Sequence, residues 1–537
     1  MGHTSFHLNR RDLLRAGIAG AGALALGPAF LRRAFAAGPV TVGDGPYGPL
    51  QPADANGIAL PAGFSSREIA RGASPVSGST PPYVWHNATD GQATFATLGP
   101  GGGPDGGWIL VANSEIPAPG GGGVSGVEFA ADGEIERAYR VLAGTTSNCA
   151  GGPTPWGMWL SCEEHDEGQV WECDPRGSRT GVARPALGIF KHEAACVDPV
   201  RQQVYLTEDQ GNGCLYRFTP DEYPDLSSGL LEVALVDGVG GVSWAAVPNP
   251  AGGALQPTRN QVAGAARFNG GEGTWYDRDF VYFTTKGDSR VWALNVVTAQ
   301  LEVLYDPEIV GPDAPLSGVD NITVSPPGDI YVCEDRRDHD ICLITPDFEI
   351  SRFLTLDPEI HSGPPSGPIA GNETVGVVFD PPGTKMYFGA QRSFGVGGNP
   401  NLPAGVVYEV SGPFRSPNSS GFSKLRLRAR RRISIERFLR HGLPIDLELD
   451  GPAGVRAQLR VAVGGRSANA GLATIGKLHT GVAIEGRTTL RVEPTKHARR
   501  LLRNRDDLAT RLKVTATGVN GYRAVARQRV RVFDRDG

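Results

Sequence analysis

Apolar residues between Gly91 and Val410 recur in short runs that are rich in Val, Ile, Phe and Tyr and bounded by Gly, Pro, Asn and Asp. Runs of this kind are typical of β-strands joined by tight turns. The pattern predicts strands at 107–113, 124–129, 138–142, 189–199, 203–209, 214–218, 279–285, 290–294, 321–326, 329–335 and 341–344, with a further strand pair across 377–389.

Units of strand, turn and strand repeat about every 40 to 60 residues, with long insertions, which is typical of the blades of a β-propeller. No segment with a convincing helical period interrupts them, so a Rossmann fold or an α/β barrel is a weak alternative. The 74 Gly and 42 Pro among 537 residues, of which 40% are hydrophobic, agree with many short strands and tight turns. The predicted fold class is therefore all-β, with a propeller over residues 37–411.

The pattern changes after Ser411. Residues 412–424 are rich in Ser, Pro and Gly and form a predicted linker. Alternating strands are predicted at 445–449, 457–463, 488–492, 512–517 and 523–533, with helical propensity at 433–440 and 494–510. The last two strands, joined around Asn520-Gly521, resemble the final hairpin of an immunoglobulin-like sandwich, so residues 425–537 are predicted to form a small β-sandwich domain.

Charge separates these two regions. From Gly421 onward there are 26 Lys and Arg against 10 Asp and Glu, a net charge of +16, whereas the residues before it sum to −21. An acidic body suits cation binding. The basic region has no aromatic stacking set and no helix-turn-helix pattern, so nucleic acid is not an expected partner.

The last predicted strand places Arg523, Val525, Arg527, Arg529 and Arg531 on one face and mostly apolar residues on the other. The apolar face is expected to pack inward. The row of arginines either contacts acidic polymers of the cell envelope, or the acidic propeller itself, or is an ordinary solvated face.

Residues 1–36 are identified as a twin-arginine export signal. Arg10-Arg11-Asp12-Leu13-Leu14 precedes an apolar run from Ala16 to Phe30, and Ala34-Phe35-Ala36 is a small-residue cleavage site. The apolar run is short for a membrane span, and no later run reaches its length. We therefore expect a soluble, monomeric protein without a transmembrane segment, exported to the periplasm, the cell surface or the medium. The twin-arginine route carries folded proteins, often with a metal or cofactor already loaded.

Seven cysteines are an odd number for an exported protein, so one of them needs a separate explanation. Cys162 and Cys173, and also Cys333 and Cys342, lie on successive predicted strands and could face each other across hairpins. Cys149 is the candidate for an unpaired functional thiol.

Cys149 stands in the segment Asn148-Cys149-Ala150-Gly151-Gly152-Pro153-Thr154-Pro155-Trp156-Gly157, which leads into Cys162-Glu163-Glu164. A thiolate and carboxylates that converge on one point suit a site that binds both iron and calcium. The alternative is a glycine-proline turn that enters a strand with a buried cysteine.

Acidic residues recur at or near the predicted first strand of each unit. First strands line the channel of a propeller, so such residues converge on its axis, where cations compensate buried carboxylates. For any one of them the alternative is a hydrogen-bonded turn residue. The set consists of Glu115, Glu193, Glu272, Asp320 with Asn321, and Glu373. Glu163, Glu164, Glu208, Asp209, Glu334 and Asp335 end second strands, as outer ligands or as solvated side chains.

The ordered series Asn-Cys-Ala-Gly-Gly-Pro-Thr-Pro-Trp-Gly, Cys-Glu-Glu, Lys-His-Glu-Ala, Gly-Glu-Gly-Thr-Trp-Tyr, Asp-Asn-Ile and Asn-Glu-Thr resembles the PhoX-type alkaline phosphatase family. The resemblance covers about Gly91 to Val410. It implies a six-bladed propeller, twin-arginine export and an axial cluster of iron and calcium that hydrolyses phosphate monoesters. One departure is Asn113-Ser114-Glu115, where the family commonly has Asn-His-Glu.

By the same resemblance Cys149 and Glu272 are expected iron ligands, and Glu193, Asp320, Asn321 and Glu373 belong to the wider cluster, which Glu115 is also expected to join. Cys149, Glu272 and Glu373 are the residues on which catalysis is expected to depend. An arginine or lysine usually clamps the phosphoryl oxygens. The candidates are Arg267, Lys286, Arg336, Arg337 and Arg392, each of which could instead be a solvated charge. His192, next to Glu193, is expected to be packed or hydrogen-bonded rather than a ligand.

Two functions remain open from the sequence. One is an exported metal-dependent phosphatase that acts on small-molecule phosphate esters. The other is a non-catalytic, metal-stabilised propeller that binds an envelope ligand. A lactonase or esterase with one calcium ion is a weaker third candidate, because it gives Cys149 no role.

Overall fold

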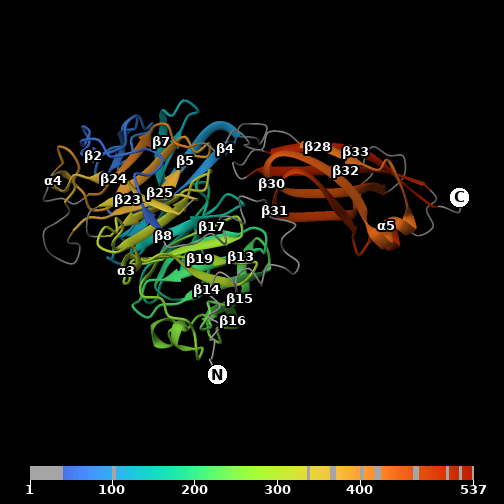
Figure 1. Ribbon diagram of the computed structural model, residues 1–537, viewed down its shortest axis with the longest axis horizontal. Coiled ribbons are helices and arrows are strands. Elements are labelled where there is room, and N and C mark those ends of the chain that lie inside the picture. Colours follow the sequence, from blue (N-terminus) through green and yellow to red (C-terminus); the bar gives the residue numbers. More distant parts are fainter. Residues whose placement is uncertain are drawn as a thin grey trace, which may run out of the picture. The chain divides into compact units, whose positions relative to one another are not determined.

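The computed structural model describes residues 40–98, 104–335, 339–346, 348–362, 371–398, 404–415, 425–463, 471–502, 507–518 and 523–534. The described residues divide into two compact units, 40–415 and 425–534, and each is described by itself (Figure 1). The predicted export signal, at residues 1–36, and most of the predicted linker lie outside the described residues.

The first unit is a six-bladed β-propeller, as expected, and each blade is a small antiparallel sheet (Figure 1). The first blade contains β4 (Thr89–Leu98), β5 (Pro104–Ser114), β6 (Gly122–Phe129) and β7 (Ile135–Thr145). The second contains β8 (Asn148–Pro153), β9 (Trp159–Glu163), β10 (Val170–Cys173) and β11 (Val182–Ala183). The third contains β12 (His192–Asp198), β13 (Gln203–Glu208), β14 (Leu215–Glu222), β15 (Asp225–Val236) and β16 (Val242–Ala246).

The remaining three blades follow in chain order. The fourth contains β17 (Gly271–Asp277), β18 (Phe280–Thr285), β19 (Arg290–Asn295) and β20 (Gln300–Tyr305). The fifth contains β21 (Val319–Val324), β22 (Ile330–Glu334), β23 (Asp340–Ile344) and β24 (Glu349–Leu356), with β1 (Thr41–Val42) and β2 (Ile58–Ala59) at its edge. The sixth contains β25 (Thr374–Phe379), β26 (Lys385–Ala390), β27 (Val406–Ser411) and the early strand β3 (Ser65–Arg71), which pairs with β27.

The innermost strands close into a ring, because β4, β8, β12, β17, β21 and β25 each contact the next and β25 contacts β4. The propeller core consists of six apolar clusters, one at each interface between neighbouring blades. Within β22, for example, Tyr331 and Cys333 face the sixth blade while Ile330 and Val332 face the fourth. Neighbours cover both faces of a blade, so its strands are apolar on both faces, which explains the nearly continuous apolar runs of the sequence.

Helices in the propeller are short. They are the 3₁₀ turns η1 (Pro185–Leu187), η2 (Gly253–Leu255) and η3 (Thr258–Asn260) and the α-helices α3 (Pro307–Val310) and α4 (Pro358–His361). The two α-helices begin alike, with Asp306 and Asp357 accepting hydrogen bonds from the backbone two residues later, ahead of a proline at the first helical position. Among the described residues, no helix has the length and apolar character needed to span a bilayer.

All seven cysteines are described, and all are buried without forming a disulfide. The expected approach across hairpins does not occur. Cys162 lies opposite Val170, so Cys173 projects from the other face of the same blade into a different apolar cluster. Cys333 and Cys342 are separated in the same way.

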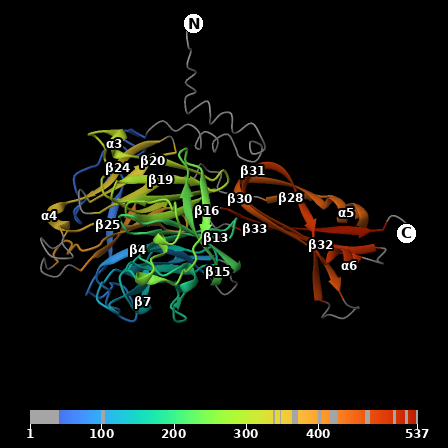
Figure 2. The same cartoon turned by 90° about the horizontal axis from the view of Figure 1, so that it is seen from below.

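The second unit is also all-β. It contains β28 (Leu425–Ala429), β29 (Arg432–Ser434), α5 (Ile435–His441), β30 (Leu443–Val463), β31 (Gly471–Pro494), α6 (Ala498–Leu502), β32 (Asp507–Gly518) and β33 (Arg523–Phe533) (Figure 2). The strands form one curled six-stranded sheet around a single apolar core, in place of the two separate sheets of a sandwich. The cause is the length of β30, whose first part pairs with β28 and whose second part pairs with β32.

Candidate active site on the propeller axis

The six innermost strands begin in the same irregular way. After the first residue that pairs with the second strand, the register shifts within a few residues in every blade. Such bulges re-aim side chains near the end of a strand. Each innermost strand thus has one equivalent residue directly after its first paired position. From the first blade to the sixth, these residues are Asp90, Cys149, Glu193, Glu272, Asp320 and Val375. We call these six residues the inner ring, and all of them are buried.

A second set of residues follows the partner positions on the second strands. The first paired residue of each innermost strand lies opposite a residue of the second strand, and each member of the second set comes directly after that opposite residue. Both sets therefore lie at the same end of the propeller axis. The members are Glu115, Glu164, Asp209, Lys286, Asp335 and Gln391, which we call the second ring. Together the two rings form the axial site, which is strongly acidic.

The glycine motif around Cys149 is explained by close contacts of its backbone. A Cβ atom on Gly151 would lie 1.9 Å from the carbonyl oxygen of Leu160 in β9, and one on Gly152 would lie 1.7 Å from that of Ala195 in β12. Only glycine permits this approach. The side-chain amide of Asn113 donates to the carbonyl oxygens of Cys149 and Ala150, at 3.0 and 2.8 Å, and fixes the backbone that carries the thiol.

The inner ring brings potential metal ligands close together. The Sγ atom of Cys149 lies 3.4 Å from Oδ2 of Asp90 and 3.3 Å from Oε1 of Glu193. One ligand atom each from Cys149, Glu164 and Glu193 lie within 4.8 Å of one another, and the same holds for Glu193, Glu272 and Asp320. Glu193 belongs to both groups and links them.

Burial and like charges act together on these acids. Burial, with the charge of Glu373, raises the pKa of Asp90 to about 7. Burial and the charge of Asp90 raise the pKa of Glu115 to about 7, and burial and Glu115 raise that of Glu164 to about 8. Burial also raises the pKa values of Glu193, Glu272 and Asp320 well above their usual range.

Within the described part of the chain, Oε1 of Glu272 has only the ion pair with Lys286, and two other carboxylate oxygens of the inner ring have neither a hydrogen-bond partner nor an ion pair. They are Oδ1 of Asp90 and Oε2 of Glu193, both buried. A buried anion without a partner is strongly destabilising, and a bound cation supplies the missing partner. The donor set of one thiol and several carboxylates therefore fits a cluster of metal ions.

Among the residues that the structure describes, three basic side chains reach the axial site. Lys286 lies 2.7 Å from Oε1 of Glu272 and 2.9 Å from Oδ2 of Asp209. Lys191 lies 2.8 Å from Glu164 and 3.2 Å from Asp209.

Arg392 completes this set. Its guanidinium lies 2.8 Å from Oε2 of Glu115 and 2.6 Å from Oε1 of Glu373, and its side chain is only 12% exposed. Burial lowers the pKa of Arg392, but the charges of Glu373 and Glu115 outweigh it and hold that pKa above its usual value. Arg392 is therefore a buried, ion-paired member of the axial site and not a solvated charge at its rim.

Two of the expected acids occupy other places than the sequence suggests. Glu115 follows the second strand β5 and not a first strand, so it belongs to the second ring. Glu373 precedes β25 and pairs with Arg392, while the inner-ring position of the sixth blade is Val375. Asn321 contacts its neighbour, because its amide donates to Oδ1 of Asp320 at 2.8 Å.

Two further candidates that the structure describes, Arg267 and His192, belong to neither ligand group. Arg267 donates to the carbonyl oxygen of Asn212 and to Cys214. His192 is fully buried, contacts Phe190 with the two tilted rings 3.6 Å apart between centroids, and has a pKa lowered by burial to about 3, so it is a packed histidine. Arg336 and Arg337 lie outside the described residues.

Sequence reasoning missed Asp90 and Gln391. Gln391 donates to Oδ2 of Asp90 at 2.5 Å and to Oε2 of Glu115 at 2.9 Å, so it joins the two rings across the first and sixth blades. The sequence around Asp90 does indicate an inner-ring position, because Asp90-Gly91 stands before an apolar run just as Glu272-Gly273 does. The acidic pair Glu163-Glu164, which ends a second strand, has two different roles. Glu163 accepts a hydrogen bond from the backbone N–H of Thr146, whereas Glu164 faces the axis.

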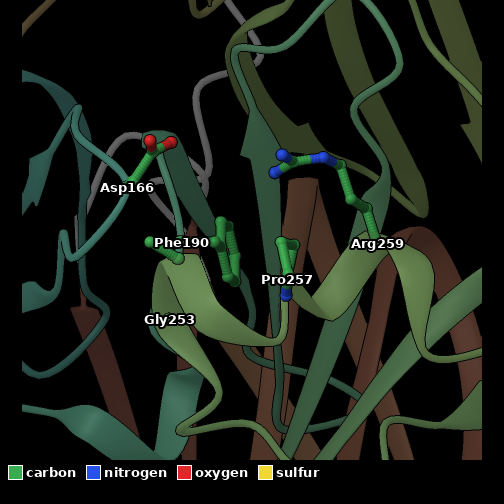
Figure 3. A pocket seen from close by; sticks show the side chains of 6 residues that line it. Asp166, Phe190, Gly253, Pro257 and Arg259 are labelled. Carbon is green, nitrogen blue, oxygen red and sulfur yellow. The ribbon is translucent and has the colours of Figure 1, made fainter.

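A small pocket lies outside the axial site (Figure 3). Its lining consists of Asp166, Phe190, Gly253, Ala254, Pro257 and Arg259, none of which belongs to either ring. Arg259 lies 2.6 Å from the buried carboxylate of Glu208, the residue that precedes Asp209. The arginine of the pocket thus supports the strand end that presents Asp209.

Comparisons with known proteins agree with the propeller fold. The sequence model of the family described as alkaline phosphatase PhoX matches residues 102–300, which span most of the first four blades. PhoX from Pseudomonas fluorescens, solved in complex with vanadate, a transition state analogue, is 18% identical, with a TM-score of 0.53, and the match covers 68% of this chain and 97% of that chain.

Two further structures are less similar. A luciferin-regenerating enzyme is 12% identical over 66% of this chain and 96% of its own, with a TM-score of 0.34. A calcium-binding protein, regucalcin, from Agrobacterium tumefaciens is 12% identical over 65% of this chain and 97% of its own, with a TM-score of 0.33. The comparison with curated proteins gives no match. The family match over residues 102–300 and the shared propeller fold confirm that this chain resembles the PhoX type of alkaline phosphatase.

Proposed function

We propose that this chain is an exported phosphatase that hydrolyses phosphate monoesters at a cluster of iron and calcium ions in the axial site. The family match supports an enzyme of the alkaline phosphatase type. The observation that carries the proposal is the pair of ligand groups linked by Glu193, with Arg392 beside them. A phosphatase needs both features, since it must neutralise and orient a phosphoryl group.

The two ligand groups suit different ions. Cys149, Glu164 and Glu193 combine a soft thiolate with carboxylates and would hold iron. Glu193, Glu272 and Asp320 offer only oxygen ligands and would hold calcium. The resemblance assigns Glu272 to iron, whereas its nearest ligand partners in this chain are Glu193 and Asp320.

When bound, such ions neutralise the charge on phosphoryl oxygens and lower the pKa of a coordinated water. The residues of the chain orient the substrate around them. The planar guanidinium of Arg392, held by Glu115 and Glu373, presents paired N–H donors that suit two oxygens of one phosphoryl group. Lys286, held by Glu272 and Asp209, adds a positive charge to the same acidic site.

The direct test measures metal content and activity of the full chain. We expect protein purified without chelator to contain iron and calcium and to hydrolyse a simple phosphate monoester at alkaline pH. Deleting the residues after Ser411 should leave the specific activity within about twofold, because all members of the axial site precede that point. Metal-loaded protein without hydrolysis would favour the binding alternative, and loss of activity only on truncation would place the site elsewhere.

Cys149→Ser is expected to lower iron content and activity together. A serine hydroxyl is a poor substitute for a thiolate ligand, and losing such a ligand should reduce activity by about 100-fold or more. Cys162→Ser is the matched control, because Cys162 is equally buried in the adjacent strand but lies in the apolar core. The control should lose thermal stability and keep its iron. Unchanged iron occupancy in Cys149→Ser would show that Cys149 is a buried turn cysteine and not an iron ligand.

A further inference from the structure

The outer face of the curled sheet in the second unit carries a continuous array of positive charge. Its residues lie on β31, β30, β32 and β33, which are neighbours in that order. They are exposed or half-buried and alternate with buried apolar residues such as Leu512, Val514 and Val530. We call them the basic face: Arg460, Lys477, Arg511, Lys513, Arg527 and Arg529.

The strand register places these charges directly opposite one another. Arg460 pairs with Arg511, and Arg511 pairs with Arg529, so three arginines form one row across three strands. In the next row Lys513 pairs with Arg527. Neighbouring strands are about 4.8 Å apart, so like charges in directly opposite positions destabilise a sheet.

In another part of the same sheet, carboxylates lie opposite the arginines and compensate their charge. There Glu448 of β30 lies between Arg426 of β28 and Arg487 of β31, at 3.7 Å from each. Arg428 likewise lies opposite Asp446. No member of the basic face has a carboxylate in a directly opposite position, and among the described residues Arg511, Lys513, Arg527 and Arg529 form no ion pair.

We propose that the basic face binds an acidic polysaccharide whose carboxylates lie across these strands and replace the missing counter-charges. Arginine supplies four of the six side chains, and its planar fork suits carboxylate groups. The face offers no aromatic side chain on which bases could stack, which argues against single-stranded nucleic acid. The predicted export would bring the protein to the acidic polymers of the cell envelope. This function is separate from the phosphatase reaction.

The test uses the full-length protein and polygalacturonate as the probe. Wild-type protein should bind the immobilised polymer at about 50 mM salt and be released at about 500 mM, since exposed charges are screened. The triple variant Arg511→Gln, Arg527→Gln, Arg529→Gln should bind at least about tenfold more weakly, because each surface cation contributes to attraction by a polyanion.

The matched control is Arg426→Gln, Arg428→Gln, Arg487→Gln, which removes the same net charge from positions opposite carboxylates. It should weaken binding by less than about threefold. The basic-face triple should also melt no lower than wild type, because it relieves cross-strand repulsion. If the triple does not fold, Arg511→Gln alone, at the centre of the row, is compared with Arg426→Gln.

Three results would overturn the proposal. They are absence of wild-type binding to the polyuronate, equal loss of binding in the two triples, and tighter binding to double-stranded DNA or inorganic polyphosphate than to the polyuronate at the same salt. Phosphate monoester hydrolysis should be unchanged in both triples, so failure here leaves the proposed phosphatase function standing.

Discussion

Replacing Glu193 by glutamine is expected to reduce phosphate monoester hydrolysis on the order of a thousandfold. Glu193 is the one residue shared by the two ligand groups, so its carboxylate is required on both sides of the cluster. Glutamine keeps the shape but removes the charge. Metal ions can supply several kcal/mol of charge stabilisation to phosphoryl transfer, and each 1.36 kcal/mol is about tenfold in rate. Elemental analysis of the same sample should show that iron and calcium fall together.

Two further substitutions separate this effect from general damage. Glu373→Gln should have a smaller effect, because the carboxylate of Glu373 lies at the edge of the site and pairs with Arg392 at 2.6 Å. Glu409→Gln is the control for losing a buried glutamate, since Glu409 is paired with Lys385 and Arg67 outside the axial site. It should lower the melting temperature but keep metal and activity. Full metal content in Glu193→Gln would show that Glu193 is not the link between the ligand groups.

Removing the metal ions with a chelator is expected to make the stability of the protein strongly dependent on pH. In the metal-free chain burial raises the pKa values of Asp90 and Glu115 to about 7 and that of Glu164 to about 8. A carboxyl with a raised folded pKa favours folding below its unfolded pKa near 4. That contribution is lost as the pH rises through the folded pKa.

The chelated protein should therefore be more stable at pH 5 than at pH 8.5. For several coupled carboxylates the difference in unfolding free energy is on the order of several kcal/mol, or a fall of about 10 °C in Tm. Thermal unfolding followed by circular dichroism at both pH values measures it. Metal-loaded protein is the control and should change much less, because bound cations favour the ionised carboxylates. A chelated Tm that is constant or rises with pH would contradict the prediction.

The fold could be predicted largely from the sequence because its strands are short, regular and bounded by turns. The predicted strand at 107–113, for example, lies within β5, and the pair across 377–389 corresponds to β25 and β26. The curl of the second unit could not be predicted, because the separate strands expected at 445–449 and 457–463 are one strand, β30, with two sets of partners. The partners of a strand depend on contacts that are distant in sequence.

The axial site could be predicted only in part for the same reason. Cys149, Glu193, Glu272 and Asp320 begin recognisable strands, and the structure brings all four to the inner ring. Asp90 was not predicted, because the first strand expected in its blade, which ends at Asn113-Ser114-Glu115, is in the structure the second strand, β5. The contact between Asp90 and Cys149 depends on bulges in two different blades, and no local pattern reveals where a bulge points a side chain.

The pairing of β3 with β27 has a consequence for the order of events during synthesis. Residues 65–71 emerge from the ribosome early, yet their partner, residues 406–411, emerges only after all the other blades. Until then β3 has no partner strand, and the sixth blade is incomplete. The sixth blade is therefore completed only after residue 411 has been translated, and a metal site that depends on the complete ring of blades would form after that point.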